Sequence, residues 1–371
     1  MPRHNKLNRY FYFLFAFIVL SSGKTFSQQK QPLNIIAYYS GGGKDLDSFN
    51  VNQLTHVIFS FCHLKENLLN VDNARDTATI QKLVSLKQKN PQLKVMLSLG
   101  GWGGCETCSP VFSTPENRAA FAQSVKKISE YFHTDGIDLD WEYPTIEGFP
   151  GHPYSYKDKE NFTALVQQLR ITLGDKYLIT FAAGGFQSYL DKSVDWRSVM
   201  PIVSWVNIMS YDLVNGYSKV SGLHTPLYST KENKESVDKA VKYLLEIGVP
   251  ANKLVIGAAF YTRVWKDVAN VNHGLYQSGV HINGVDYKHY AAKLNAKEGF
   301  TYYWNDTAQA PYWYNASKKM FATGDDKRSV KLKTKYALDN HLGGIMFWEL
   351  TLDTYKNGLV EEMHNVANSN K

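Results

Sequence analysis

Residues 135–144 read Asp-Gly-Ile-Asp-Leu-Asp-Trp-Glu-Tyr-Pro, a stretch in which acidic and apolar side chains alternate. Asp138, Asp140 and Glu142 take every second position, with apolar residues between them. Successive side chains of an extended strand point to opposite faces, so the three acids share one face. Carboxyl groups gathered on one face of an apolar strand repel one another and resist ionising together. The pattern therefore predicts a carboxylic acid that stays protonated near neutral pH.

A half-solvated strand would show a similar alternation, and this is the plain structural alternative. Such a face usually mixes basic and hydroxyl residues with its acids, whereas this one has no basic residue. Tyr143-Pro144 then ends the strand, because proline cannot continue a central ladder. The acids thus lie at the end of a strand, where loops begin and active sites are usually built. Asp135 has the opposite parity and is predicted to cap the turn into the strand.

Short apolar runs and helical patterns alternate along the rest of the chain. Strands are predicted at 34–40, 56–62, 94–99, 136–141, 177–183, 204–210, 253–260 and 343–348, and helices include 117–132, 159–173 and 236–247. Thr114 is predicted to cap the first of these helices, with Pro115 behind it, and Thr230 to cap a later one. Eight strand–helix units in a chain of this size predict an α/β fold, a (β/α)8 TIM barrel with a parallel sheet.

The spacing of the strands breaks once, between the seventh and the eighth. About eighty residues separate them, more than one loop plausibly contains. The stretch is rich in Tyr and Trp and is interpreted as a small α+β insertion over 264–335, so the barrel would comprise 28–263 and 336–371. No internal repeat and no Ser/Thr/Pro-rich linker that would indicate a second domain is visible in the sequence.

The first residues are typical of a secretory signal peptide, assigned to 1–27. Three basic residues precede an apolar run from Tyr10 to Leu20 that is short for a membrane span. The prediction is a secreted or periplasmic protein with no membrane association after signal removal. Residues 1–27 carry four of the basic residues and no acid, so the net charge of +7 falls to about +3 without them. Such a mild excess indicates no nucleic-acid partner.

The three cysteines do not form a disulfide framework. Cys105 and Cys108 lie in a glycine-rich loop and could form a small local disulfide in an oxidising compartment. A zinc site would need two further ligands that no Cys/His cluster supplies, and a redox motif would need a different strand–helix context. Cys62, inside an apolar run, is interpreted as a buried free thiol.

Asp-x-x-Asp-x-Asp-x-Glu followed by Tyr-Pro resembles the signature of glycoside hydrolase family 18, the chitinases and their relatives. Further pieces follow in the family's order at the strand ends: Ser98-x-Gly-Gly101-Trp102, then Met209-x-Tyr211-Asp212, and finally Trp348. Taken alone, these would be a glycine loop, a buried Met beside a turn, and a core Trp. Tyr261-Thr-Arg263, after the seventh strand, differs slightly from the family's pattern, because the family more often has glycine between the tyrosine and the arginine. The family also carries an insertion before the last strand when its substrate groove is deep.

The resemblance implies a role for each acid. Glu142, nearest the opening, would be the general acid/base, and the substrate's own N-acetyl carbonyl would attack the anomeric carbon with overall retention. Asp140 would hydrogen-bond the acetamide N–H, and Asp138 would share a proton or hydrogen bond with Asp140. Tyr211 would donate to the acetamide oxygen. The resemblance also implies a set of residues that contact the sugar through their side chains or backbone. These are Tyr38, Phe61, Ser98, Gly101, Trp102, Tyr143, Met209, Asp212, Tyr261, Arg263 and Trp348.

The leading prediction is a chitinase that hydrolyses β-1,4 bonds between N-acetylglucosamine units, acting as a monomer on chitin or chitooligosaccharides. One alternative is an endo-β-N-acetylglucosaminidase acting on N-glycans or peptidoglycan, although Asp212 and the insertion favour chitin. The other is a non-catalytic chitin-binding lectin, against which the intact Glu142 argues. No metal or organic cofactor is implied, because acid–base chemistry and the substrate's amide account for the reaction.

Overall fold

The computed structural model describes residues 1–2 and 33–369, so the predicted signal peptide lies almost wholly outside the described residues. Within them, eight parallel strands form a closed barrel in the order β1-β14-β8-β7-β6-β5-β4-β2, and β2 pairs with β1 to close it. Their bounds are β1 Asn34–Tyr39, β2 His56–Lys65, β4 Lys94–Gly100, β5 Gly136–Asp140, β6 Leu178–Gly184, β7 Trp205–Met209, β8 Leu254–Ala259 and β14 Gly344–Trp348. The predicted barrel is confirmed, with each strand within a few residues of its expected place.

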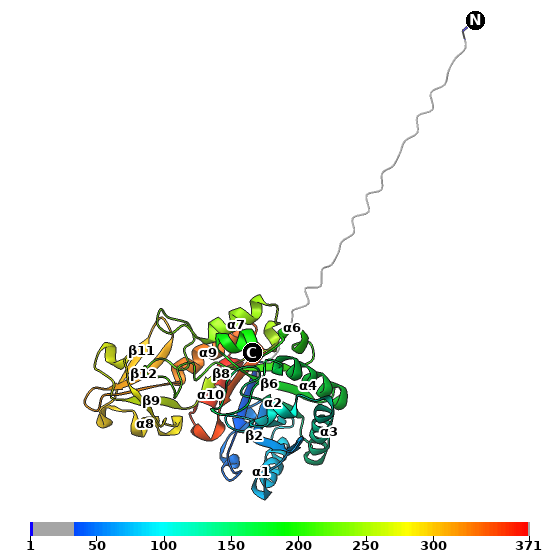
Figure 1. Ribbon diagram of the computed structural model, residues 1–371. Coiled ribbons are helices and arrows are strands. Elements are labelled where there is room, and N and C mark those ends of the chain that lie inside the picture. Colours follow the sequence, from blue (N-terminus) through cyan, green and yellow to red (C-terminus); the bar gives the residue numbers. More distant parts are fainter. Residues whose placement is uncertain (3–32, 370–371) are drawn as a thin grey trace. The chain divides into compact units, whose positions relative to one another are not determined.

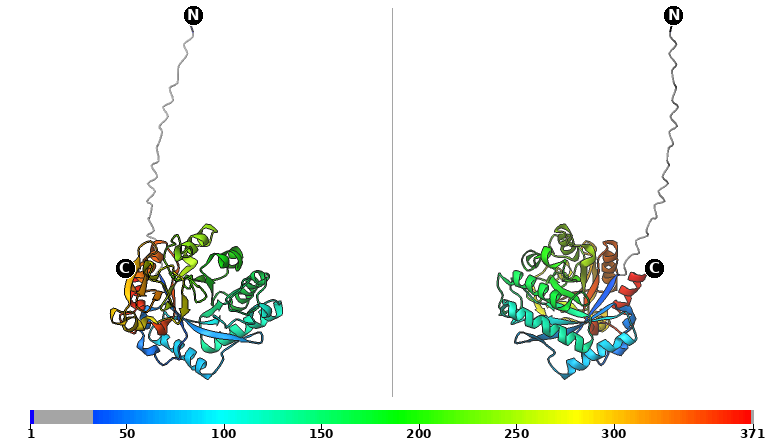
Figure 2. Two further views of the ribbon diagram at one scale, coloured as in Figure 1. Left: turned by 60° about the vertical axis from the view of Figure 1, so that its left-hand side comes forward. Right: turned by 90° about the vertical axis from the view of Figure 1, so that its right-hand side faces the viewer.

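Helices lie on the outer side of these strands (Figures 1 and 2). The longer ones are α1 Ala74–Ser85, α3 Pro115–Phe132, α4 Asp158–Leu173, α7 Val237–Glu246, α9 Lys327–Asp339 and α10 Leu359–Asn368, and the short ones are α2 Cys108–Val111, α5 Gln187–Lys192 and α6 Trp196–Val199. Single 3-10 turns occur at Leu46–Ser48, Val51–Gln53, Leu86–Gln88, Ala251–Lys253, Asn272–Gly274, Tyr287–His289, Ala296–Glu298 and Leu350–Leu352.

The two predicted helix caps have different outcomes. Thr114 caps α3 by accepting a hydrogen bond from the backbone N–H of Asn117, with Pro115 at the first helical position. The prediction for Thr230 is wrong. Ser236 caps α7 instead, because its hydroxyl accepts from the N–H of Lys239, whereas the Thr230 hydroxyl accepts from Asn233 in a turn before the helix.

The barrel separates two layers of buried side chains. One fills the interior and includes Ile36, Tyr38, Met96 and Met346, while a larger layer lies between the strands and the helices. Ile137, Leu139 and Trp141 belong to the larger, outer layer. Their parity directs Asp138 and Asp140 into the barrel interior, and Asp140 is the last residue of β5, at the end where such barrels place their active sites.

A second, five-stranded antiparallel sheet lies to one side of the barrel (Figure 1), in the order β10-β9-β13-β12-β11. Its elements are β9 Thr262–Lys266, β10 Val280–Ile282, α8 Tyr290–Lys293, β11 Thr301–Asn305, β12 Ala310–Asn315 and β13 Met320–Gly324, and a short β3, Leu68–Asn70, pairs separately with β2. The aromatic residues of β11 and β12 pack within this sheet, which explains their abundance there. The bounds 264–335 for an insertion stay a prediction.

Other structural roles foreseen from the sequence are also visible. Cys105 and Cys108 form a disulfide, and Cys62 is a buried free cysteine. Asp135 has a structural role, as expected, but it connects β5 to its surroundings and does not cap the turn before the strand. Its carboxylate accepts from the backbone N–H of Val95 on the neighbouring strand and forms an ion pair with Lys87.

Candidate active site

Asp138 lies wholly buried in the barrel interior and is surrounded by hydrogen-bond donors. Its Oδ2 accepts from the Tyr38 hydroxyl and from Ser98 Oγ, both at 3.0 Å. Its Oδ1 accepts from Thr180 Oγ1 at 2.6 Å and from Asn207 Nδ2 at 3.1 Å. Burial raises the pKa of Asp138, and these four donors oppose that rise. Ser98 and Tyr38, both among the predicted sugar contacts, thus donate to Asp138 in this structure.

Asp140, two residues further along β5, has a different environment. It is 4% exposed, and no described residue hydrogen-bonds its Oδ1. Burial, followed by the nearby charges of Glu142 and Asp138, raises the pKa of Asp140 well above its usual value. A buried carboxyl oxygen without a partner is costly, so this atom is available to a ligand that brings its own N–H or O–H.

Glu142 follows the end of β5 at the barrel opening and is only half buried. Burial, with a further contribution from the negative charge of Asp212, raises the pKa of Glu142 to about 7. A carboxylic acid with this pKa can both donate and accept a proton near neutral pH. The predicted series of three acids therefore extends from the closed interior to the opening.

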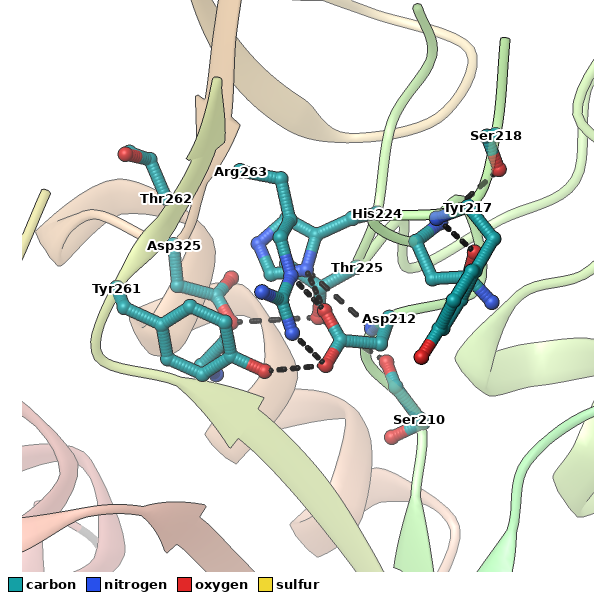
Figure 3. A network of polar contacts seen from close by, with 12 residues as sticks. Ser210, Asp212, Tyr217, Ser218, His224, Thr225, Tyr261, Thr262, Arg263 and Asp325 are labelled. Atoms are coloured by element: carbon teal, nitrogen blue, oxygen red, sulfur yellow. Dashed lines mark hydrogen bonds and ion pairs between the residues drawn. The ribbon is translucent and has the colours of Figure 1, made fainter. Parts of the chain in front are cut away.

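Asp212 lies beyond the end of β7 and receives several donors (Figure 3). Arg263 donates from Nε and Nη2, each at 2.6 Å, and the Tyr261 hydroxyl donates at 2.8 Å. Nδ1 of His224 lies 3.3 Å from Oδ1 of Asp212. Burial alone would raise the pKa of Asp212, but hydrogen bonds from Arg263 and His224 hold it well below its usual value. Asp212 is thus a fixed negative charge beside Glu142.

Trp348 at the end of β14 lies against two other aromatic residues of the predicted set. Its ring stacks on Phe61, with centroids 5.5 Å apart and planes 13° from parallel, and Tyr38 lies 6.0 Å away. Gly101 makes room for this arrangement. A Cβ at Gly101, whose φ is +79°, would lie 2.3 Å from Cε2 of Phe61. These contacts bring residues of β1, β2 and β14, and the residue that follows β4, to one place.

The remaining predicted residues lie around the same opening. Trp102 is 45% exposed and its ring centroid is 6.3 Å from that of Tyr143. The Tyr211 hydroxyl is next to the sulfur of Met346, and burial, then the charge of Asp140, raises the pKa of Tyr211 well above its usual value. Met209 is buried at the end of β7. An exposed Trp beside neutral tyrosine hydroxyls presents both an apolar face and donors to a ligand.

Three residues of this site were missed by the sequence analysis: Thr180, Asn207 and His224. Thr180 and Asn207 are polar residues within apolar strands, at the parity that faces the interior, so their types and positions could have indicated them. His224 lies in an irregular segment after β7, where no periodicity indicates its direction.

Among residues 1–2 and 33–369, no group of three His, Cys, Asp or Glu side chains is placed to hold a metal ion. No helix in those ranges is long and apolar enough to cross a membrane.

Comparison with known proteins gives a consistent result. Residues 34–353 match the family model described as Glycosyl hydrolases family 18. The chain is 38% identical to Chitinase A1 of Niallia circulans in an alignment of 301 residues that covers 75% of this chain but 43% of that protein. It is 28% identical to Chitinase B of Serratia marcescens, covering 85% of this chain and 77% of that protein.

Among solved structures, the fold is similar to that of a glycoside hydrolase family 18 N-acetylglucosaminidase from Paenibacillus barengoltzii. The two share a TM-score of 0.82 and 34% identity, covering 90% of this chain and 99% of that one. Chitinase ChiA74 from Bacillus thuringiensis has a TM-score of 0.84 at 28% identity, covering 91% of this chain and 70% of that one.

Proposed function

The chain belongs to glycosyl hydrolases family 18, as its motifs predicted, and from this premise we propose that it is a chitinase hydrolysing β-1,4 bonds between N-acetylglucosamine units. The observation that carries the proposal is the series of three acids that begins on β5 and continues just past its end. It ends in Glu142, whose pKa is about 7, and it includes Asp140, whose Oδ1 has no partner among the described residues. The named chitinases among the relatives support the same activity.

The proposed reaction uses the sugar's own acetamide group. Glu142 protonates the leaving glycosidic oxygen while the acetamide oxygen attacks the anomeric carbon, so the glycosidic bond breaks and an oxazolinium ion forms. Glu142, now ionised, then takes a proton from water as the water opens that ring, and the anomeric configuration is retained. No carboxylate nucleophile is required across the sugar, because the acetamide oxygen makes that attack. Asp138, Asp140 and Glu142 all come from one side and could not supply one.

The other residues orient that acetamide and the sugar. Asp140 accepts the acetamide N–H at its free Oδ1 and stabilises the positive charge that develops. Asp138, held by its four donors, adds a nearby negative charge that helps raise the pKa of Asp140, and Tyr211 donates to the acetamide oxygen. Trp348 offers a ring to the apolar face of a pyranose, while Asp212 and Arg263 contact hydroxyl groups.

Export of the protein is also proposed, on the basis of residues 1–27 alone.

The direct test is a product analysis of penta-N-acetylchitopentaose, an N-glycopeptide and peptidoglycan, incubated side by side with the full chain. Hydrolysis of the pentasaccharide with retained anomeric configuration is the expected result. Release of sugar from the glycopeptide or peptidoglycan, with the pentasaccharide intact, would replace the proposal with the endo-β-N-acetylglucosaminidase alternative.

A second candidate is an enzyme that removes single N-acetylglucosamine units. It is favoured by the similarity of this chain to the N-acetylglucosaminidase structure, because the two align over 99% of that protein. The same pentasaccharide experiment separates the two. A chitinase gives dimers and trimers early, whereas the second candidate releases the monomer from the start.

Activity should depend on pH through Glu142. A general acid acts only while protonated, so kcat/KM should be highest below its pKa and fall about ten-fold per pH unit above pH 7. A pH profile of pentasaccharide hydrolysis measures this limb. A fall that begins near pH 4 to 5, the range of an exposed glutamic acid, would contradict the assignment of Glu142.

Replacing Trp348 by Ala should weaken sugar binding by roughly ten-fold or more, because a stacking surface for the pyranose is lost. Isothermal titration with chitooligosaccharides on a Glu142→Gln background would measure it without turnover. Trp196→Ala is the control, because Trp196 is buried on α6 outside the barrel interior. An unchanged isotherm for Trp348→Ala would return this residue to a structural role.

A further inference from the structure

A buried ion pair lies behind the candidate site, outside the set of predicted residues. Lys333 on α9 and Asp325, just after β13, both have fully buried side chains, and Lys333 Nζ is 2.7 Å from Asp325 Oδ2. Asp325 also accepts from Ser329 Oγ at 2.7 Å and from the backbone N–H of Ala259, at the end of β8, at 2.9 Å. The pair thus joins the end of the second sheet, helix α9 and a barrel strand.

Stability alone does not explain such a pair. Removing two charges from water costs free energy that their attraction rarely exceeds, and apolar residues of similar size often serve the fold as well. A buried pair that is fully hydrogen-bonded instead fixes the position of the groups around it. The partner that connects this pair to the candidate site is Thr225.

The Thr225 hydroxyl connects the ion pair to the end of β7 by hydrogen bonds. Lys333 Nζ donates to Thr225 Oγ1 at 2.5 Å, which leaves the threonine proton for the backbone oxygen of Ser210 at 3.0 Å. Asp325 lies further from that hydroxyl, at 3.4 Å (Figure 3). Ser210 directly precedes Tyr211 and Asp212.

His224, the neighbour of Thr225, contacts Asp212 itself. Its Nδ1 lies 3.3 Å from both the backbone nitrogen and Oδ1 of Asp212, and its backbone oxygen accepts from the N–H of Leu213 at 3.0 Å. A proton on Nδ1 would be donated to Oδ1, and without that proton Nδ1 would accept from the N–H. In either state the buried ring is fixed against Asp212 (Figure 3).

Asp212 needs such support because of its backbone. Its φ is +54°, in the left-handed region that residues other than glycine rarely occupy. A residue in this region keeps its conformation only where the surrounding structure holds it. The hydrogen bonds from His224 and, through Ser210, from Thr225 act on this one turn.

We propose that the buried Lys333–Asp325 pair is a positioning device for the sugar-binding carboxylate of Asp212, acting through the His224–Thr225 dipeptide. None of the four residues contacts the sugar in this scheme. The inference rests on the proposed function, because it assigns these residues to the site that binds the sugar. It makes helix α9 and the end of the second sheet part of the support of that site.

The test is a double-mutant cycle between Thr225→Val and Asp212→Ala, with kcat, KM and thermal unfolding measured on penta-N-acetylchitopentaose and the full chain. Valine keeps the shape of threonine but removes the hydroxyl, while the Lys333–Asp325 contact remains. Thr225→Val should lower kcat/KM about ten-fold in the wild-type background and less than about two-fold in the Asp212→Ala background, because its effect passes through Asp212. Thr334→Val, on the next residue of α9, should leave both backgrounds within about two-fold.

An equal loss in both backgrounds would overturn the proposal, and so would no loss in the wild-type background. A second pair of variants keeps it testable if Thr225→Val does not fold. His224→Asn places an amide atom where Nδ1 lies and should keep most of the activity, whereas His224→Leu should lose about as much as Thr225→Val. Equal activity of these two histidine variants would also contradict the proposal.

Failure of the inference can be told apart from failure of the proposed function. If the wild-type chain hydrolyses the pentasaccharide and Glu142→Gln does not, the proposed function holds. An additive cycle under those conditions removes only the positioning role. If Glu142→Gln retains full activity, the proposed function itself fails whatever the cycle shows.

Discussion

Replacing Glu142 by Gln should lower turnover of penta-N-acetylchitopentaose by about 10³-fold or more, near the upper end of what a positioned general acid contributes. Glutamine keeps the size of the side chain but has no proton to give to the leaving oxygen. Binding of the pentasaccharide should persist, because the substitution leaves Trp348, Phe61 and Asp140 in place. Steady-state kinetics and a binding isotherm together would separate these two effects.

Glu147→Gln is the matched control for this prediction. Glu147 lies in the same loop, five residues further on, but it is exposed. It should remain within about two-fold of wild type, as is usual for a surface substitution. If Glu142→Gln is as active as this control, the general acid has been misassigned.

Asp140→Asn is expected to lower kcat by about 10²-fold or more, comparable to the loss of one stabilising group for a developing charge. Asparagine can still accept from the acetamide N–H, but it lacks the negative charge that stabilises the oxazolinium ion. The effect should therefore fall on kcat more than on KM. Kinetics on the pentasaccharide and thermal unfolding of the same preparation measure both quantities.

Asp135→Asn serves as the comparison for this variant. Asp135 begins the same segment, but it contacts Val95 and Lys87 and faces away from the candidate site. Its substitution should lower the unfolding temperature and leave kcat of the folded enzyme close to wild type. Unchanged kcat in Asp140→Asn would reject participation of the substrate's acetamide.

The sequence predicted the barrel because each strand has a local signal. Apolar runs of six to eight residues alternate with helical periodicity, and the parity of Asp138 and Asp140 set their direction into the interior. The environment of these acids was less predictable. Thr180 donates to Asp138 because the register of β5 and β6 pairs the two residues, and Asn207 comes from the next strand, β7, so both contacts depend on a strand order and register that the sequence does not show.

The cap of α7 shows a second kind of limit. Thr230 and Ser236 are both reasonable caps by residue type, and only the path of the intervening turn decides between them. His224, Thr225, Asp325 and Lys333 show a third. Their partners lie in irregular segments or across the second sheet, so no local periodicity indicates that they meet.

The most direct measurement compares penta-N-acetylchitopentaose with its fully de-N-acetylated counterpart at the same chain length. If the sugar's own acetamide carries out the attack, its removal leaves Glu142 with no nucleophile to assist, and kcat/KM should fall by about 10³-fold or more, well within what a positioned reacting group contributes. Similar rates on the two pentasaccharides would mean that the enzyme supplies its own nucleophile, and would contradict the proposed mechanism.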